Sequence, residues 1–146
     1  MQNSKYKSLS KQLAPKTPIL RNCVVAFLVG GLICVFGQFI QNIFLKHFNF
    51  TAETVGSPTV AVLIFIAALL TGLGVYDKLG QFAGAGSAVP VTGFANSITS
   101  AAMEHRSEGL VLGVGGNMFK LAGSVIVFGV VAAFFIALIK TLWGMF

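Results

Sequence analysis

Residues 79–103 read LGQFAGAGSAVPVTGFANSITSAAM, a segment without a charged side chain but rich in small and weakly polar ones. Pro90 removes a backbone donor near its middle. Its helix propensity is lowered further by Gly80, Gly84, Gly86 and Gly93. A continuous span of this kind would leave peptide groups unsatisfied in lipid, whereas irregular backbone is tolerated where it is buried in protein or lines a water-filled cavity. We therefore expect a Gly/Pro-broken or re-entrant membrane element at about 79–103.

The chain around this segment is strongly apolar. Of its 146 residues, 55% are hydrophobic and only 10% are charged, and the mean hydropathy is +0.86. A globule of this size could not bury so much apolar surface, so part of it must face lipid. Since a helical span needs roughly 20 apolar residues to cross about 30 Å of hydrocarbon, the length allows about four membrane elements in one domain. The sequence therefore predicts an all-α integral membrane protein.

Two apolar runs on the N-terminal side are expected to be transmembrane helices, at about 23–45 and 58–76. The first ends where Lys46 returns the chain to water. The second should begin at Pro58, a residue favoured at the first helical position, with Ser57 before it as the capping residue.

The third strong span is expected at about 110–139. It contains Lys120, which leaves two alternatives. One tilted helix carries a lysine inside the membrane, or a half-helix ending at Phe119 precedes a clean span from Leu121. Burying an unpaired ammonium in lipid costs at least about 2.5 kcal/mol, so Lys120 should either line a water-filled path or extend its charge to the interface.

The N-terminal residues 1–21 form a basic tail that precedes a single membrane domain, residues 22–146. Five of the ten Lys and Arg residues lie in the tail, namely Lys5, Lys7, Lys11, Lys16 and Arg21. Because such residues accumulate on the cytoplasmic side of membrane segments, we expect a cytoplasmic N-terminus. The tail lacks interleaved aromatic residues and any nucleic-acid recognition motif, so we expect no nucleic-acid partner.

The sequence contains no pattern typical of an enzyme. The two histidines lie far apart, and no nucleophile stands beside a plausible base. Cys23 and Cys34, eleven residues apart in one apolar run, cannot pair along a straight helix and lack further ligands for a metal. We therefore expect no catalytic residues, no metal site and no cofactor.

Small residues predict close helix contacts at two places. Gly30 and Gly37 fall on one face of the first span, together with Cys34. Gly109 and Gly113 form a GxxxG step before the last span.

The hydrophilic patch at residues 104–108 separates the broken element from the last span. It holds Glu104, His105, Arg106 and Glu108. One interpretation is a solvated cytoplasmic turn. The other is a docking surface for a soluble partner, or a gate, in which the histidine could respond to pH.

Three runs of the chain resemble the stage V sporulation protein AC family of endospore-forming bacteria. They are FLVGGLICVFGQFIQN at 27–42, GVYDKLGQFAGAGSAVPVTGFANSITSAAMEHRSEG at 74–109 and NMFKLAGSVIVFGVV at 117–131. The resemblance covers nearly the whole chain beyond the first 15 residues. The sibling AE type shares the PVTGFAN-like core, but EHRSEG resembles the AC type.

This resemblance implies a subunit of a complex in the forespore and spore inner membrane. The family's complex carries dipicolinic acid, as its calcium chelate, into the developing spore and releases it in germination. The partners implied are an AE-type membrane subunit and a soluble AD-type subunit at the cytoplasmic face, and opening under membrane tension is also implied. A multisubunit assembly is therefore expected.

A dicarboxylate solute would meet backbone dipoles and a cation along the broken element and the start of the last span. The hypothetical solute path comprises Gly84, Gly86, Ser87, Pro90, Thr92, Asn96, Asn117 and Lys120. A rival hypothesis makes the chain a non-conducting membrane scaffold that docks the soluble subunit.

Overall fold

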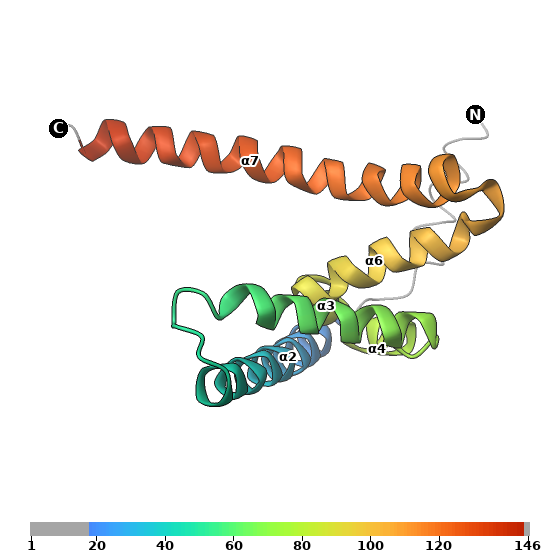
Figure 1. The fold of residues 1–146 in the computed structure, drawn as a ribbon, viewed down its shortest axis with the longest axis horizontal. Coiled ribbons are helices and arrows are strands. Elements are labelled where there is room, and N and C mark those ends of the chain that lie inside the picture. The colour runs from blue at the N-terminus through green and yellow to red at the C-terminus, as the bar shows by residue number, and fades with distance from the viewer. Residues whose placement is uncertain (1–17, 145–146) are drawn as a thin grey trace.

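The computed structural model describes residues 18–144, and this part of the chain is helical and contains no strand (Figure 1). The predicted all-α class is therefore confirmed. Most of the predicted basic tail, residues 1–17, lies outside the described residues. The elements are α2 (Ile19–His47), α3 (Gly56–Gly72), α4 (Tyr76–Ala83), α5 (Ala85–Ala88), α6 (Val91–Glu104), the 3₁₀ turn η1 (Arg106–Glu108), the π-helical η2 (Leu110–Gly115) and α7 (Gly116–Gly144).

The first predicted span, 23–45, corresponds to α2, which is longer at both ends. Pro18 precedes the helix and accepts a hydrogen bond from the Asn22 N–H at 3.0 Å. At its other end Lys46 and His47 still belong to the last turn, where positive charge is favourable beside the helix dipole. With 29 residues, α2 is about 44 Å long, enough to cross a bilayer.

The second predicted span, 58–76, is wrong at both boundaries. Helix α3 begins at Gly56, and Ser57 makes no capping hydrogen bond. The helix ends at Gly72, because Gly74 adopts φ +69° and turns the chain into α4 at an angle of 100°. Its 17 residues span about 25 Å. The described chain thus has two helices long and apolar enough to cross a membrane, and three only if the bent pair α3–α4 counts as one span.

The segment 79–103 is helical but broken, as its composition predicts. We call α4, α5 and α6 the broken element. Its first break is at Gly84, with φ +54°, a backbone conformation that suits glycine. The second is at Pro90, whose extended ψ of 162° places it just before α6.

The last apolar run forms one continuous helix from Leu110 to Gly144, so the alternative with a half-helix ending at Phe119 is wrong. Lys120 lies within α7, and the helix continues beyond the predicted end at 139. None of the residues of α7 is buried. Figure 1 shows α7 leaving the other helices after its first turns.

The small interior lies where α3 packs on the broken element. It is built from Ala67, Tyr76 and Ala95, with Leu70 and Leu79 against them. Most other large apolar side chains of the described part are exposed, including many of the Phe, Ile and Val residues of α2 and all of those in α7. Lipid or protein partners must cover this surface, which agrees with an integral membrane protein.

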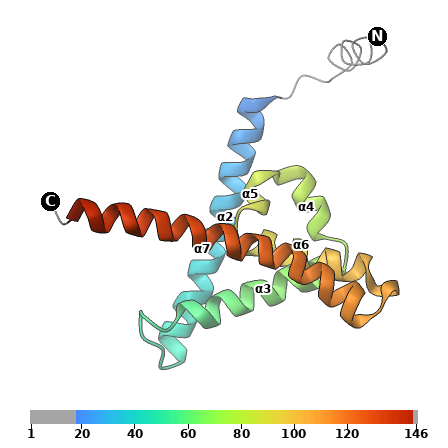
Figure 2. The same cartoon turned by 90° about the horizontal axis from the view of Figure 1, so that it is seen from above.

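The connections between the helices lie at two opposite ends of the molecule. In both views the loop between α2 and α3 lies at the same end as the C-terminal turn of α7, and the turn between α6 and α7 lies at the opposite end (Figures 1 and 2). Helix α6 runs in the same general direction as α3.

Candidate functional site

The Tyr76 hydroxyl joins the three helices of the broken element. The side chain opens α4 and is only 4% exposed. Its hydroxyl oxygen lies 2.9 Å from the Ser87 carbonyl oxygen in α5 and 2.8 Å from Thr92 Oγ1 in α6. Because a carbonyl only accepts, Tyr76 donates its one hydrogen to Ser87, and the Thr92 hydroxyl can supply the hydrogen of the second bond. The phenol therefore connects the two sides of the Pro90 break.

A second, partly buried contact ties α3 to α6. Thr71, 1% exposed, donates from Oγ1 to Asn96 Oδ1 at 2.8 Å and shares that hydrogen with the Ala67 carbonyl at 2.7 Å. We call the five residues of these two contacts the polar core; they are Thr71, Tyr76, Ser87, Thr92 and Asn96. All their buried side-chain polar atoms in the described structure have a partner.

Close glycine contacts hold the broken element against α2. A Cβ on Gly86 would lie 2.7 Å from Ala26 Cα, and one on Gly30 would lie 3.2 Å from the Gly86 carbonyl oxygen. A Cβ on Gly37 would lie 3.3 Å from Leu63 Cδ1 of α3. The predicted helix contacts of Gly30 and Gly37 are thereby confirmed.

The structure separates the residues proposed for the solute path into two groups. Ser87, Thr92 and Asn96 belong to the polar core, and Gly84, Gly86 and Pro90 shape the backbone around it. Asn117 and Lys120 lie instead on α7. Asn117 Nδ2 donates to the Gly113 carbonyl at 2.9 Å, and Lys120 is exposed.

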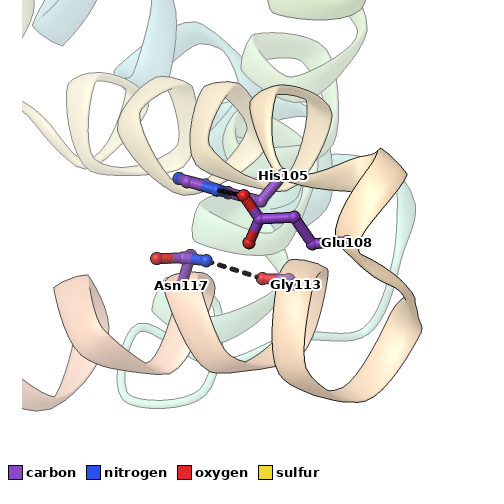
Figure 3. A network of polar contacts seen from close by, with 4 residues as sticks. All are labelled: His105, Glu108, Gly113 and Asn117. Atoms are coloured by element: carbon purple, nitrogen blue, oxygen red, sulfur yellow. Dashed lines mark hydrogen bonds and ion pairs between the residues drawn. The ribbon is translucent and has the colours of Figure 1, made fainter.

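The hydrophilic patch forms the turn that connects α6 to α7 (Figure 3). His105 Nδ1 lies 3.0 Å from Glu108 Oε1, an ion pair when the histidine is protonated. The Glu108 N–H also donates to the His105 carbonyl at 3.1 Å. Glu104, Arg106 and Glu108 are exposed, which is compatible both with a solvated turn and with a docking surface.

Glycines make this turn possible, but not by the predicted helix-packing step. Gly109 lies outside a helix and has φ +97°. Gly113 packs against Glu108, where a Cβ would come within 2.8 Å of the Glu108 Cβ. The interpretation of Gly109 and Gly113 as a GxxxG helix interface is therefore wrong, because they fold a tight turn.

Two hollows adjoin the broken element. A pocket of about 360 Å³ lies between the start of α2 and the α4–α5 junction, where Asn22, Gln81 and Gly84 line it. A smaller cavity of about 110 Å³ lies between α2, α3 and the polar core, and Phe36, Tyr76 and Thr92 are among its lining residues. The broken element thus has one pocket at its α4–α5 junction and a smaller cavity beside Tyr76 and Thr92 of the polar core.

Tyr76 and Thr71 were not among the residues predicted for the site. Both residues lie in an apolar run of the sequence. In such a run a tyrosine is usually interpreted as a residue at the membrane interface, and a threonine as a packing residue without a binding role. The available signal was chemical: a tyrosine that becomes buried must find a partner for its hydroxyl.

Within residues 18–144, no three His, Cys, Asp or Glu side chains lie close enough to hold a metal ion. Cys23 and Cys34 are free thiols and are both exposed on α2.

The fold and the site define a class: a helical membrane protein with a hydrogen-bonded, broken polar element between apolar helices. The chain belongs to the family described as SpoVAC/SpoVAEB sporulation membrane protein, whose model matches residues 22–139. It is 65% identical, over 135 residues, to stage V sporulation protein AC of Bacillus subtilis (strain 168), covering 92% of this chain and 90% of that protein. No solved structure matches the chain.

Proposed function

We propose that this protein is a subunit of a passive channel in the spore inner membrane. Its solute is dipicolinate with calcium, which enters during sporulation and leaves in germination. The observation that carries the proposal is the likeness, over most of both chains, to a protein named stage V sporulation protein AC. By this likeness we assign the AC family's role in dipicolinate movement to this chain. The polar, broken element is the feature of the chain that such a role requires.

The chemistry of the broken element supports conduction. Ser87, Thr92 and Asn96 place hydroxyl, carbonyl and amide groups in the interior of an otherwise apolar molecule. Such groups can replace part of the hydration shell of a small polar solute. Lys120, on α7, adds the positive charge that would attract a dicarboxylate.

The partners follow from the same proposal. The exposed turn with Glu104, Arg106 and Glu108 is the surface we assign to the soluble AD-type subunit, on the cytoplasmic side with the N-terminus. The exposed apolar faces of α2 and α7 are available to lipid and to an AE-type membrane subunit. Opening under membrane tension would need no energising site in this chain.

A flux measurement tests the proposal. Purified protein, alone and with an AE-type subunit, is reconstituted in liposomes loaded with calcium dipicolinate, and efflux is followed with and without osmotic tension. We expect tension-dependent efflux that empty liposomes lack. Efflux no faster than in protein-free liposomes, with the protein correctly inserted, would contradict a conducting role.

The scaffold remains the second candidate, and one observation favours it. The polar core is internally satisfied, since its hydroxyls and the Asn96 amide oxygen bond one another or the backbone. A scaffold would need nothing more than this stable interior and an exposed docking turn. Binding of the soluble subunit in detergent, together with absent efflux in every reconstitution, would identify the scaffold.

A further inference from the structure

We propose that Tyr76 is a latch that keeps the broken element closed, and that the described conformation is the closed state of the solute path. The latch consists of the two hydrogen bonds of the Tyr76 hydroxyl, so it can be tested without measuring the flux of a solute. Its consequence for transport rests on the proposed channel function.

The position of Tyr76 suits a latch because its two partners lie on opposite sides of the Pro90 break. Ser87 is in α5 and Thr92 is in the first turn of α6. A carbonyl in the last turn of a helix lacks its intrahelical donor, and Tyr76 supplies that donor to Ser87. One hydroxyl thus fixes α5 relative to α6, at a point where the backbone itself is interrupted.

The same bonds occupy the groups that a solute would use. In the described conformation the Ser87 carbonyl and the Thr92 hydroxyl are both bonded to Tyr76, and Ser87 is only 1% exposed. Since a carbonyl oxygen can accept two hydrogen bonds, a solute or water chain that reaches these two buried groups must compete with the phenol or displace it. Release of Tyr76 is therefore the step that opens this part of the path.

The surroundings leave the phenol room to move. The residues lining the cavity of about 110 Å³ include Tyr76 and Thr92 as well as the apolar Ile33, Phe36 and Leu63. Side chains in a fully packed interior move only with their neighbours, whereas a ring beside a cavity can leave its place without displacing a helix. Thr71 and Asn96 continue to hold α6 to α3 while the latch opens.

Cysteine labelling tests the latch directly. Ser87→Cys serves as the reporter in full-length protein that also carries Cys23→Ala and Cys34→Ala, since the Ser87 backbone carbonyl survives the change. Labelling by a water-soluble maleimide should be slow in this parent. Removing the phenol hydroxyl in Tyr76→Phe breaks both of its hydrogen bonds and should raise the rate at least about fivefold, since one such bond contributes about 1 kcal/mol.

Matched variants separate the latch from a general loss of structure. Thr92→Val removes the second partner and should raise the rate similarly, whereas Thr92→Ser keeps the hydroxyl and should label like the parent. Thr141→Val is the control, because Thr141 also donates to a backbone carbonyl, that of Ala137 at 2.9 Å, but lies exposed on α7. Each variant is first checked for unchanged helix content.

The outcomes distinguish the latch from the channel. Equal slow labelling of the parent, Tyr76→Phe and Thr92→Val would overturn the latch, even if the wild-type protein conducts. Fast labelling of the parent would equally overturn the assignment of a closed state. Faster labelling of both variants, with no dipicolinate efflux from liposomes containing any of the proteins, would support the latch and refute the channel.

Discussion

Gly86 shows how one residue can determine the distance between two elements. It belongs to the short helix α5 and faces the backbone of α2, where a Cβ would come within 2.7 Å of Ala26 Cα and 2.8 Å of the Ala26 carbonyl carbon. Real Cβ atoms do not approach backbone so closely, so any side chain at this position must separate the two helices. This contact holds α5, which precedes the Pro90 break, against α2.

We expect Gly86→Ala to destabilise the protein by about 1–3 kcal/mol, as overpacking in a tight interior does. The matched control is Gly80→Ala in α4, where a Cβ meets no atom within 4 Å. Because alanine favours helix, this control should be neutral or stabilising by up to about 1 kcal/mol. The thermal unfolding midpoint in detergent measures both, and equal midpoints for the two variants would show that the α2–α5 contact is not tight.

Lys120 is the residue whose charge the proposed path uses. It is exposed on α7, one turn beyond Asn117. A unit charge about 4 Å from an anion contributes about 1 kcal/mol even in water, and more where water is partly excluded. We expect Lys120→Gln to lower the rate of dipicolinate efflux at least about fivefold, a factor that corresponds to about 1 kcal/mol.

The control for this charge is Lys140→Gln, which removes an exposed lysine near the other end of α7. It should leave efflux, and the dipicolinate content of spores, unchanged. A normal dipicolinate content with Lys120→Gln, at normal protein levels, would show that Lys120 only extends its charge to the membrane interface.

The break at Pro90 is the feature of the broken element that a single substitution can change. Pro90 has ψ 162°, and its carbonyl accepts the Gly93 N–H at 2.8 Å. An alanine there could adopt helical angles and donate its N–H, so that α5 and α6 would tend to join. We expect Pro90→Ala to lower dipicolinate uptake and release, because a joined helix would withdraw the Ser87 carbonyl from the path.

Pro58→Ala provides the comparison for Pro90. Pro58 lies in the first turn of α3, where a backbone N–H has no intrahelical acceptor and proline is tolerated. This variant should transport normally in the same spores. Equal transport by the Pro90 and Pro58 variants would mean that the break has no part in solute movement.

The elements could be predicted from the sequence to the extent that composition determines them. Apolar runs long enough to cross a membrane predicted α2 and α7, and the Gly/Pro-rich run predicted a broken segment. The end of α3 could not be predicted in this way, because Gly72-Leu73-Gly74 stands within an apolar run and its turn depends on the positive φ of Gly74. The sequence also could not decide whether the helix continues through Lys120, since a lysine is compatible with one continuous helix and with a half-helix that ends before it.

The candidate site was predictable by residue type but not by pairing. Ser87, Thr92 and Asn96 were expected to act together as polar groups on a broken element, and the structure places Ser87 and Thr92 on Tyr76 but Asn96 on Thr71. Their partners Thr71 and Tyr76 precede Asn96 and Thr92 by 25 and 16 residues. Spacing along one helix cannot reveal such contacts, because they depend on how α4 returns toward the start of α6.

At the scale of the whole molecule, helix lengths favour a particular membrane topology. Helices α4 and α6 have 8 and 14 residues, or about 12 and 21 Å, and each is too short to cross about 30 Å of hydrocarbon. The broken element should therefore enter the membrane and return to the same side. Lys78 and Arg106, near its two ends, favour the cytoplasmic side, where we also expect the N-terminus.

We predict that Ser107 is cytoplasmic, and that Thr51 and the C-terminal end of α7 lie on the opposite side of the membrane. Along the longest axis of the molecule the α2–α3 loop lies toward the same end as the C-terminal turn of α7, and the α6–α7 turn lies at the other end, while α2 itself crosses α7 steeply (Figures 1 and 2). Single cysteines at Thr51 and Ser107, both exposed, would be probed with a membrane-impermeant maleimide in a chain lacking Cys23 and Cys34. Thr51→Cys should react in intact cells and Ser107→Cys only after permeabilisation. If both react in intact cells, the broken element crosses the bilayer and α7 returns the C-terminus to the cytoplasm, so the docking turn could not meet a cytoplasmic subunit.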